Sequence, residues 1–499
     1  MPQDLNLPAA LRLLLSELNA VLSVRRVEAY ATGGFLRDAL LGITISDLDI
    51  SVRADPLDLG PQLAGTFNGH YFPLDEERRL VRVLLPAHDL QLDLMPIEGS
   101  IEDDLMTRDY TIDAMAAPLN QVAVGSVVLI DPAGGLPDLL DRSVRLISED
   151  ALRRDPLRLL RGVRLASLLD FMIEPLTREL IRRHAGLLDT VAAERQRDEL
   201  VQMLRTPRGG RGVRLLDELG LLDRVLPELA VTRAVEQPKE HHWDVFGHSL
   251  AALEALDALF DENEPAADRV KPLWQELWSQ LEWWDDARGY LSREYVANTH
   301  RCSLIKLAGL LHDIGKPETK SFEDSGRMRF LGHHHVGADI AARLMRRLRF
   351  SSRETDLVRA MIDAHLRPLQ MAQQGAPSRK AIYRFFRDTG EAGIDTLFLS
   401  LADHLGTVGP RVDLEGWRQH VSLVSYILRK RLEEAEIVAP SKLVDGDDLM
   451  AALGVAAGPL LGGLLEVVRE AQASGEVSTQ EQAIALARRR LEQTKTPAS

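Results

Sequence analysis

The chain has 499 residues, with 75 Asp or Glu against 60 Lys or Arg, so its formal net charge is −15. This length exceeds what one hydrophobic core usually supports, which predicts several domains, and the charge excludes a protein that coats nucleic acid through uniform basicity. A single local basic surface stays compatible with it. The one cysteine, Cys302, excludes a disulfide framework and a thiolate metal site and fits a reducing cytoplasm.

Residues 1–27 predict a helix rather than a signal peptide. The stretch "MPQDLNLPAALRLLLSEL" carries an early acid and a periodic apolar face, whereas a signal peptide has a basic start and an uninterrupted apolar core. No run of eighteen or more apolar residues occurs along the chain, so we expect no membrane span. The expected protein is soluble and cytoplasmic.

Between residues 28 and 147, short apolar runs alternate with Gly, Pro and Asp turns, a pattern typical of strands and turns. The stretch "AYATGGFLRD" predicts a strand, a turn at Gly33 and Gly34, and the start of a helix. Backbone N–H groups in such a turn can bind phosphate oxygens. We therefore expect this segment to face a phosphorylated ligand.

The next predicted strand, "SDLDISV", places Asp47 and Asp49 on one face because side chains alternate along a strand. Two carboxylates on one face suit Mg²⁺, and Asp93 in "LQLDLMP" is a possible third ligand for two-metal phosphoryl transfer. The alternative is a solvated Asp-x-Asp on an exposed strand. The Gly-Gly turn and Arg-Asp pair upstream favour magnesium.

From residue 151 onward the apolar period changes to three or four, which predicts helices to the end of the chain. Asp155 and Arg158 are three residues apart, so we expect one helix to present both on one face. A carboxylate there accepts a hydrogen bond from the amino group of cytosine or adenine, and a guanidinium donates to a ring nitrogen. Guanine and uracil place a carbonyl opposite the carboxylate. The pair would select CTP and ATP; the alternative is a surface ion pair.

Residues 151–235 form a local basic segment, with sixteen Arg against twelve Asp or Glu. Its densest part is "RTPRGGRGVR", which contains Arg205, Arg208 and Arg211. Guanidinium groups suit phosphates, so these three residues are predicted to bind RNA. A solvated helical face explains the same pattern equally well.

The second half of the chain concentrates histidines and aspartates in five spaced helical motifs. Neutral imidazoles together with carboxylates suit a divalent transition metal better than Mg²⁺, and such an ion activates water toward a phosphoester. Single histidines are mostly core or surface residues, but this clustering favours a metal site. The predicted ligands are His248, His312, Asp313, His333, His365 and Asp403.

Several of these stretches resemble one family in the family's own order. Gly33-Gly34-Phe-Leu-Arg37-Asp38 followed by Asp47-Leu-Asp49 resembles the first motif of the class II tRNA nucleotidyltransferases (CCA-adding enzymes) and bacterial poly(A) polymerases. "TRDYTIDAMA" (107–116) is similar to their sugar- and phosphate-binding segment, and "RDPLRLLRGVRLA" to their nucleotide-reading helix. His312-Asp313 resembles the metal pair of the HD phosphohydrolases, with His248 and Asp403 as outer ligands. His333 and His365 match the extra ligands of binuclear members.

The resemblance implies an α+β fold, with a polymerase-beta-like head of mixed sheet and helices followed by an all-α body and an all-α HD domain. The implied limits are 1–27 (N-terminal helix), 28–147 (head), 148–235 (neck and body), 236–420 (HD domain) and 421–499 (C-terminal helices). The implied activity is addition of C and/or A from CTP and ATP to the 3′ end of tRNA with Mg²⁺. The implied nucleotide contacts are Gly33, Gly34, Arg37, Arg108, Asp109, Asp155, Arg158 and Arg161.

Three positions depart from the family pattern. Arg154 stands where a Glu is expected, Thr107 replaces an Arg, and Asp113 replaces an Asn. Two alternatives stay open: a poly(A) polymerase, and an HD phosphohydrolase whose nucleotidyltransferase half only binds RNA. The sequence does not decide whether C, CC, A or full CCA is added, nor the HD metal, its substrate or the oligomeric state.

Overall fold

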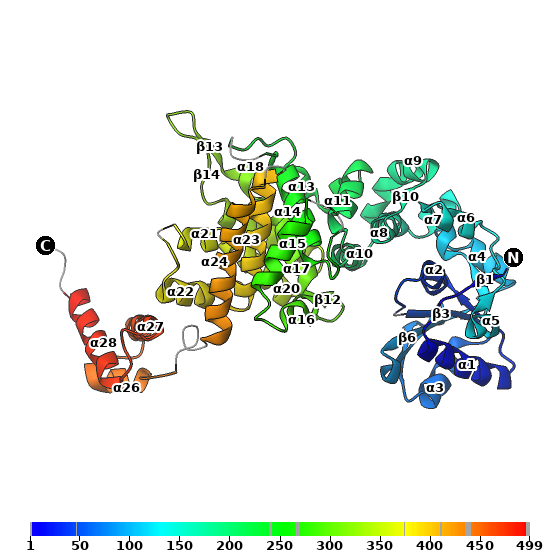
Figure 1. Cartoon of the computed structure of the whole chain (residues 1–499), viewed down its shortest axis with the longest axis horizontal. Helices are drawn as coiled ribbons and strands as arrows, with labels where there is room; N and C mark the ends of the chain where they lie inside the picture. Colours follow the sequence, from blue (N-terminus) through cyan, green and yellow to red (C-terminus); the bar gives the residue numbers. More distant parts are fainter. Residues whose placement is uncertain are drawn as a thin grey trace. The chain divides into compact units, whose positions relative to one another are not determined.

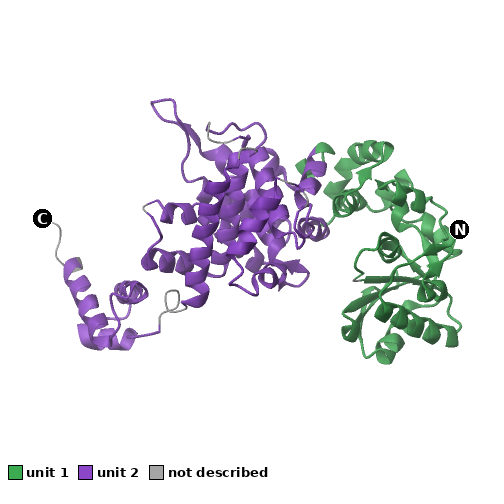
Figure 2. Cartoon of the chain, in the orientation of Figure 1, with its two compact units in different colours: residues 1–192, 218–224 green, residues 193–217, 225–499 purple. Residues whose placement is uncertain are grey.

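The computed structural model describes residues 2–45, 47–238, 242–265, 267, 269–373, 375–409, 412–434 and 441–495. The chain forms two compact units, residues 1–192 with 218–224 and residues 193–217 with 225–499 (Figure 2). The boundary between them falls inside the expected 148–235 segment, so the domain limits stay predictions. Among the described residues, no helix has the length and apolar character needed to cross a membrane.

The first unit is built on a six-stranded mixed sheet in the order β4-β5-β6-β3-β2-β7 (Figure 1). Strands β3 and β6 are parallel, and their register pairs Asp49 with Asp93. The other neighbouring strands are antiparallel. The strands are β2 (Ala29–Thr32), β3 (Asp47–Val52), β4 (His70–Asp75), β5 (Leu80–Leu85), β6 (Leu90–Pro96) and β7 (Ala116–Pro118).

The sheet has one apolar face and one functional face. Leu48 and Ile50 of β3 are fully buried, and the alternation of the strand turns Asp47 and Asp49 to the opposite face. Helices α1 (Ala9–Val24) and α3 (Pro56–Thr66) lie on one side of the sheet and α2 (Gly33–Leu41) on the other (Figure 1). The expected N-terminal helix corresponds to α1 and packs as part of the head.

Shorter elements follow the sheet in the first unit. The segment that resembles the sugar-binding motif contains a 3-10 turn, η2 (Thr111–Asp113), and lies ahead of two consecutive helices, α7 (Glu149–Arg154) and α8 (Arg158–Leu169). The remaining helices are α4 (Ile101–Met106), α5 (Leu119–Val124), α6 (Gly135–Leu140) and α9 (Pro175–His184). Two-residue strands β9 (Ser143–Val144) and β10 (Met172–Ile173) pair in parallel.

The second unit is helical, with two small hairpins, β11–β12 (Glu294–Val296, Thr299–His300) and β13–β14 (Lys320–Phe322, Met328–Phe330). Its centre is formed by five packed helices: α14 (Val245–Phe260), α17 (Arg301–Leu311), α19 (His333–Arg347), α20 (Ser352–Ala364) and α23 (Gly393–Val408). Around them lie α10 (Ala193–Arg205), α11 (Gly209–Glu218), α15 (Lys271–Gln280), α16 (Ala287–Ser292), α22 (Arg379–Thr389) and α24 (Leu414–Glu433). These central helices carry the predicted histidine ligands.

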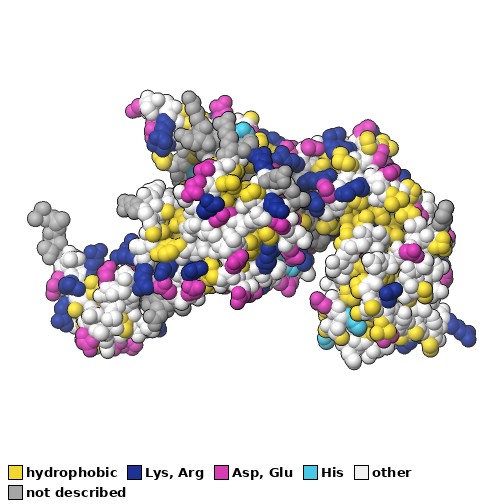
Figure 3. All heavy atoms as spheres, viewed as in Figure 1, with side chains coloured by type: hydrophobic (Ala, Val, Ile, Leu, Met, Phe, Trp, Pro, Cys, Tyr) yellow, Lys and Arg dark blue, Asp and Glu magenta, His cyan; other side chains and the backbone are white. Residues whose placement is uncertain are grey.

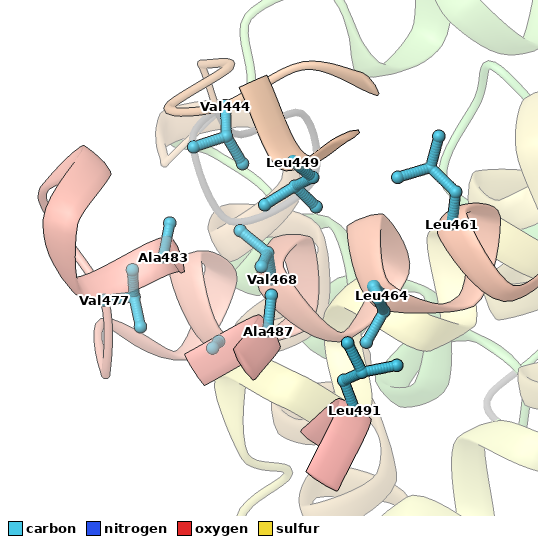
Figure 4. Packing of buried hydrophobic residues seen from close by; sticks show 10 residues of the cluster. Val444, Leu449, Leu461, Leu464, Val468, Val477, Ala483, Ala487 and Leu491 are labelled. Atoms are coloured by element: carbon cyan, nitrogen blue, oxygen red, sulfur yellow. The ribbon is translucent and has the colours of Figure 1, made fainter. Parts of the chain in front are cut away.

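The last three helices, α26 (Gly446–Leu453), α27 (Pro459–Ser474) and α28 (Gln480–Lys495), enclose a small core of their own (Figure 4). Leu449, Leu464, Val468 and Ala487 are among its buried members. Helix α27 packs on α22, where Arg384 of α22 donates two hydrogen bonds of 2.6 Å to Glu470 of α27.

Candidate active site and metal centre

The predicted magnesium ligands meet on one face of the central sheet. The parallel β3–β6 register places the side chains of Asp49 and Asp93 next to each other on that face. Asp49 Oδ2 accepts a hydrogen bond of 3.2 Å from the backbone N–H of Phe35 at the start of α2. Burial raises the pKa of Asp49, and the negative charge of Asp93 adds to the shift. A cation between these carboxylates would relieve that repulsion.

Asp93 is held by a residue that the sequence analysis missed. Arg82 on β5 donates two hydrogen bonds of 2.7 Å, one to each carboxylate oxygen of Asp93. The β5–β6 register pairs these two residues directly. A single arginine inside the apolar strand "LVRVLL" was the available signal, but only the sheet register identifies its partner.

The backbone at Gly33 and Gly34 lies close to the charged side chains of the site. Gly33 has φ +62°, in the left-handed region that favours glycine, and a Cβ atom there would lie 2.9 Å from Asp49 Oδ2. The same Cβ would lie 3.3 Å from the Arg108 guanidinium. At Gly34 a Cβ would lie 3.3 Å from the guanidinium of Arg37 and 3.5 Å from Asp49 Oδ2. Both glycines therefore allow the backbone to lie close to the carboxylate and guanidinium groups.

The two predicted phosphate-binding arginines differ in their surroundings. Arg37 is 6% exposed and its guanidinium faces inward, 2.8 Å from Asp38 and 2.5 Å from Asp113. Arg108 lies next to the carboxylate face, where it donates hydrogen bonds of 3.2 Å to Ser51 Oγ and to the Asp113 carbonyl. Arg108 is therefore better placed than Arg37 to reach a phosphate.

Asp155 and Arg158 do not share a helix, so that part of the prediction is wrong. Helix α7 ends at Arg154 and α8 begins at Arg158, with Asp155 extended between them at φ −143° and ψ 96°. Pro156 explains the break, because a residue before proline is disfavoured in the helical region. Asp155 Oδ1 instead accepts a hydrogen bond of 3.2 Å from the Leu157 N–H. Base reading by the pair stays a prediction, now on a loop and a helix start.

The segment 107–113 contacts helix α8 directly. Asp109, the predicted ribose contact, lies 2.9 Å from the Arg161 Nε. The Tyr110 hydroxyl donates a hydrogen bond of 2.7 Å to the backbone carbonyl of Arg158. Arg154, at the position where a Glu was expected, forms an exposed ion pair of 2.7 Å with Asp150. That pair joins residues four apart on the exposed surface of α7.

The predicted RNA-binding arginines lie at the junction of α10 and α11, where Arg205 and Arg208 are exposed. Two buried side chains fix the backbone of this junction. Lys306 of α17 donates a hydrogen bond of 2.7 Å to the Thr206 carbonyl, and Asp257 of α14 accepts one of 2.7 Å from the Gly210 N–H. On the face drawn in Figure 3, Lys and Arg side chains are interspersed with Asp and Glu. RNA binding by the junction stays a prediction.

The six predicted metal ligands of the second unit come together. The Nε2 atoms of His248 and His312 lie 3.0 Å apart, and Asp403 Oδ1 lies 3.1 Å from the former and 3.5 Å from the latter. Asp313 joins them, at 3.2 Å from His248 Nε2 and 3.3 Å from His312 Nε2. Two groups could each hold an ion, His248 with His312 and Asp403, and His312 with Asp313 and His365.

The orientation of the imidazoles fits metal binding. The Nδ1 atoms of His312, His333 and His365 each donate to a backbone carbonyl, at 2.8, 2.7 and 2.7 Å. In the neutral imidazoles these hydrogen bonds place the single proton on Nδ1, so that Nε2 is the nitrogen that would bind a metal, which at His312 would replace a second proton. His333 Nε2 lies 3.3 Å from Asp313 Oδ1. The donor set of imidazoles and carboxylates fits a divalent transition metal.

The pKa values of the buried groups in this centre shift in different directions. Burial opposes charge on His312, but Asp313 and Asp403 outweigh it and raise the pKa of His312 to about 10. Burial, with the charge of His312, lowers the pKa of His365 to about 3. The pKa values of Asp313 and Asp403 are well below the usual value, because the neighbouring charges and hydrogen bonds outweigh burial. The carboxylates are therefore ionised and able to bind a cation.

Lys316 is a further residue of this centre that the sequence analysis missed. Its Nζ lies 2.6 Å from Asp313 Oδ2 and donates a hydrogen bond of 2.6 Å to Gln237 Oε1. The side chain is buried, three residues after Asp313. That spacing on a helical turn was the signal that could have identified it.

Comparison with known proteins assigns the family. The chain is 35% identical over 472 residues to the A-adding tRNA nucleotidyltransferase of Deinococcus radiodurans, covering 93% of this chain and 96% of the relative. The chain belongs to the tRNA nucleotidyltransferase family. The CC-adding enzyme of Thermus thermophilus is 34% identical over 465 residues, with 91% and 92% coverage.

Family models agree with this assignment, and solved structures share the fold. The Poly A polymerase head domain matches residues 29–99, the HD domain 283–407 and tRNA nucleotidyltransferase domain 2 419–487. The Thermotoga maritima CCA-adding enzyme in complex with tRNA has a TM-score of 0.57 at 18% identity, covering 98% of this chain and 99% of that one. A CCA-adding enzyme with ATP has a TM-score of 0.59 at 18% identity over both full lengths. The expected α+β fold with an HD domain is confirmed.

Proposed function

We propose that the protein transfers C and/or A from CTP and ATP to the 3′ end of tRNA, using Mg²⁺ at Asp47 and Asp49 together with Asp93. The observation that best supports this proposal is the β3–β6 register, which aligns Asp49 with Asp93 next to Gly33 and Gly34. The relatives named A-adding and CC-adding enzymes support the same reaction, as do solved structures with tRNA, ATP and CTP. A free thiol at Cys302 supports a reducing, cytoplasmic location.

Each part of the head contributes one task to this reaction. Asp47, Asp49 and Asp93 would hold Mg²⁺, which would lower the pKa of the attacking 3′-hydroxyl and neutralise charge on the pyrophosphate. The backbone of Gly33 and Gly34 and the guanidinium of Arg108 position the triphosphate, and Asp109, oriented by Arg161, accepts from the ribose. Fixed donors of this kind act without reorganising during the reaction.

Asp155 and Arg158 read the base in this proposal. The Asp155 carboxylate accepts from the amino group of cytosine or adenine, and the Arg158 guanidinium donates to the adjacent ring nitrogen. Asp155 reaches this position from the extended residue before Pro156 rather than from a helix. The guanidinium of Arg158 donates hydrogen bonds of 3.4 Å to the backbone carbonyls of Thr107 and Ala151.

We further propose that the HD centre binds a divalent transition metal and hydrolyses phosphoesters. His248, His312, Asp313 and Asp403 would hold a first ion, and His333 and His365 would complete a second. The ionised carboxylates and the fixed Nε2 lone pairs support metal binding. Phosphoester hydrolysis follows from the water-activating role of such ions. Arg205, Arg208 and Arg211 would bind RNA phosphates on the same unit.

The deciding experiment offers the purified protein with Mg²⁺ three tRNA transcripts, ending at the discriminator base, at C or at CC. Each labelled nucleotide is supplied alone and in mixtures. Incorporation of C and A that stops at CCA supports full CCA addition, and C or A on one end only supports a partial enzyme. An unlimited A ladder would indicate a poly(A) polymerase. No incorporation on any end would overturn the proposal and leave the HD half as the active part.

A further inference from the structure

Asp113 links the phosphate side of the head to helix α8 through two arginines. Its Oδ1 lies 2.5 Å from Arg37 Nη1, and its Oδ2 lies 3.5 Å from Arg161 Nη2. The side chains of Arg37 and Asp113 are only 7% and 3% exposed. Because both are enclosed by protein, neither is placed to touch a nucleotide, whereas the side chain of Arg161 is 42% exposed.

The charges in this link support one another. Burial alone would raise the pKa of Asp113, but Arg37, Arg161 and Arg164 outweigh it, so the pKa of the carboxyl lies below its usual value. The carboxylate in turn compensates the buried guanidinium of Arg37, which otherwise has only Asp38 within ion-pair distance among the described residues. Removing one partner of such a buried pair leaves an uncompensated charge.

The same segment fixes the first turns of α8 at two more points. The Tyr110 hydroxyl donates to the Arg158 carbonyl at 2.7 Å, and Asp109 lies 2.9 Å from Arg161 Nε. Gly162 allows this approach, because a Cβ atom there would lie 2.1 Å from the Tyr110 hydroxyl oxygen. The turn of α8 that carries Arg158 is therefore attached to residues 109–113 rather than free to shift.

We propose that Asp113 is a positioning residue for base selection. One carboxylate oxygen holds Arg37 of α2 and the other orients Arg161 of α8, so the carboxylate fixes the location of Arg158 relative to the triphosphate. This inference rests on the proposed function. It gives Arg37 a positioning role in place of a direct phosphate contact. Discrimination by hydrogen bonds to a base edge depends on such fixed geometry, because a displaced guanidinium accommodates the wrong base.

The test substitution is Asp113→Ala, which removes both carboxylate oxygens, whereas Asn, the residue usual in the family at this position, would keep one of them. The matched control is Asp138→Ala. Asp138 accepts hydrogen bonds of 2.5 Å from Thr111 Oγ1, within the same 109–113 segment, and of 2.9 Å from Arg145 Nε, yet no hydrogen bond or ion pair joins it to Arg37 or Arg161 in the described residues. The measured quantity is the ratio of kcat/KM for the nucleotide that wild type incorporates to kcat/KM for UTP.

We expect Asp113→Ala to lower this ratio about tenfold or more, with a rise in KM for the correct nucleotide, while Asp138→Ala changes it less than about twofold. Asp113→Ala leaves Arg37 buried without its carboxylate, so a fall in Tm is also expected. The double variant Asp113→Ala with Arg37→Met removes that charge and should recover part of the lost Tm. Its selectivity should stay low, because Arg161 still lacks the Asp113 carboxylate.

Each other outcome has a definite meaning. An unchanged ratio in a folded Asp113→Ala variant overturns the inference, and so does a double variant that recovers selectivity together with Tm, because the role of Asp113 would then be structural. Equal losses in Asp113→Ala and Asp138→Ala overturn it as well. The wild type is assayed in parallel: if it incorporates nothing, the proposed function fails first and the inference fails with it.

Discussion

The two predicted metal sites are built in opposite ways. In the head, Asp47 and Asp49 come from one strand and Asp93 from its parallel neighbour, and they lie on a face of the sheet where Asp47 is exposed. In the HD centre, His248, His312 and Asp403 come from three packed helices and their neighbourhood, and the histidines are fully buried.

The difference corresponds to what each site has to hold. An open carboxylate face leaves coordination positions for triphosphate oxygens, which suits Mg²⁺ that binds together with its substrate. Buried imidazoles, each oriented by a backbone carbonyl, form a preorganised set that suits a resident ion. If both sites bind metal as proposed, the substrate would complete the head site, and protein side chains would supply the ligands of the HD site.

The largest effect is expected from Asp49→Ala. Loss of this carboxylate should reduce nucleotide incorporation roughly a thousandfold or more, the scale on which a lost electrostatic contact to a transition state acts. Folding should be unaffected, because the buried carboxylate is repelled by Asp93. Incorporation on a CC-ending transcript measures the loss of activity, and a thermal melt measures the stability of the fold. Normal incorporation by this variant would exclude Asp49 as a magnesium ligand.

The second prediction concerns the HD centre. His312→Ala should lose most of the transition metal that co-purifies with the protein, because His312 belongs to both possible ligand groups. Nucleotide incorporation should change by less than about twofold if the sites are independent. Metal analysis of the dialysed protein and the incorporation assay test this. His335→Ala is the control on helix α19, since His335 lies 2.5 Å from Asp363 and outside both ligand groups. Equal metal content in both variants would contradict the prediction.

The third prediction uses the pH dependence of the head site. The folded protein holds the proton of Asp49 more tightly than the unfolded chain, so in the absence of Mg²⁺ this group destabilises the fold as pH rises through its raised pKa. Mg²⁺ competes with that proton, so the Mg²⁺-induced increase in Tm should grow as pH rises from acid to neutral. Asp49→Asn should lose this pH-dependent gain. The same gain in wild type and Asp49→Asn would show that another group binds the ion.

The fold class and the grouping of the candidate ligands could be predicted from the sequence, and their binding of metal stays a prediction. Alternation along β3 places Asp47 and Asp49 on one face, and the order of the histidine motifs, together with the family resemblance, identified the other group. Long-range partners were not predictable. Nothing local indicates that Arg82 holds Asp93 or that Arg37 turns inward to Asp113. The error at Asp155 had a visible cause, since Pro156 disfavours a helical residue before it, and the spacing of three was given more weight.

The smallest effect is expected at the α10–α11 junction, where one arginine can be compared with its neighbour. If Arg208 binds an RNA phosphate, Arg208→Ala should reduce the slope of log K against log salt concentration by about 0.7 to 0.9, one counterion's contribution. Arg214→Ala is the comparison on the same basic segment, where the guanidinium donates hydrogen bonds of 2.7 and 2.9 Å to Glu254. Binding of labelled tRNA over a salt series measures both slopes. A wild-type slope in both variants would mean that the basic segment is a solvated helical face, and RNA affinity would then have to come from other residues.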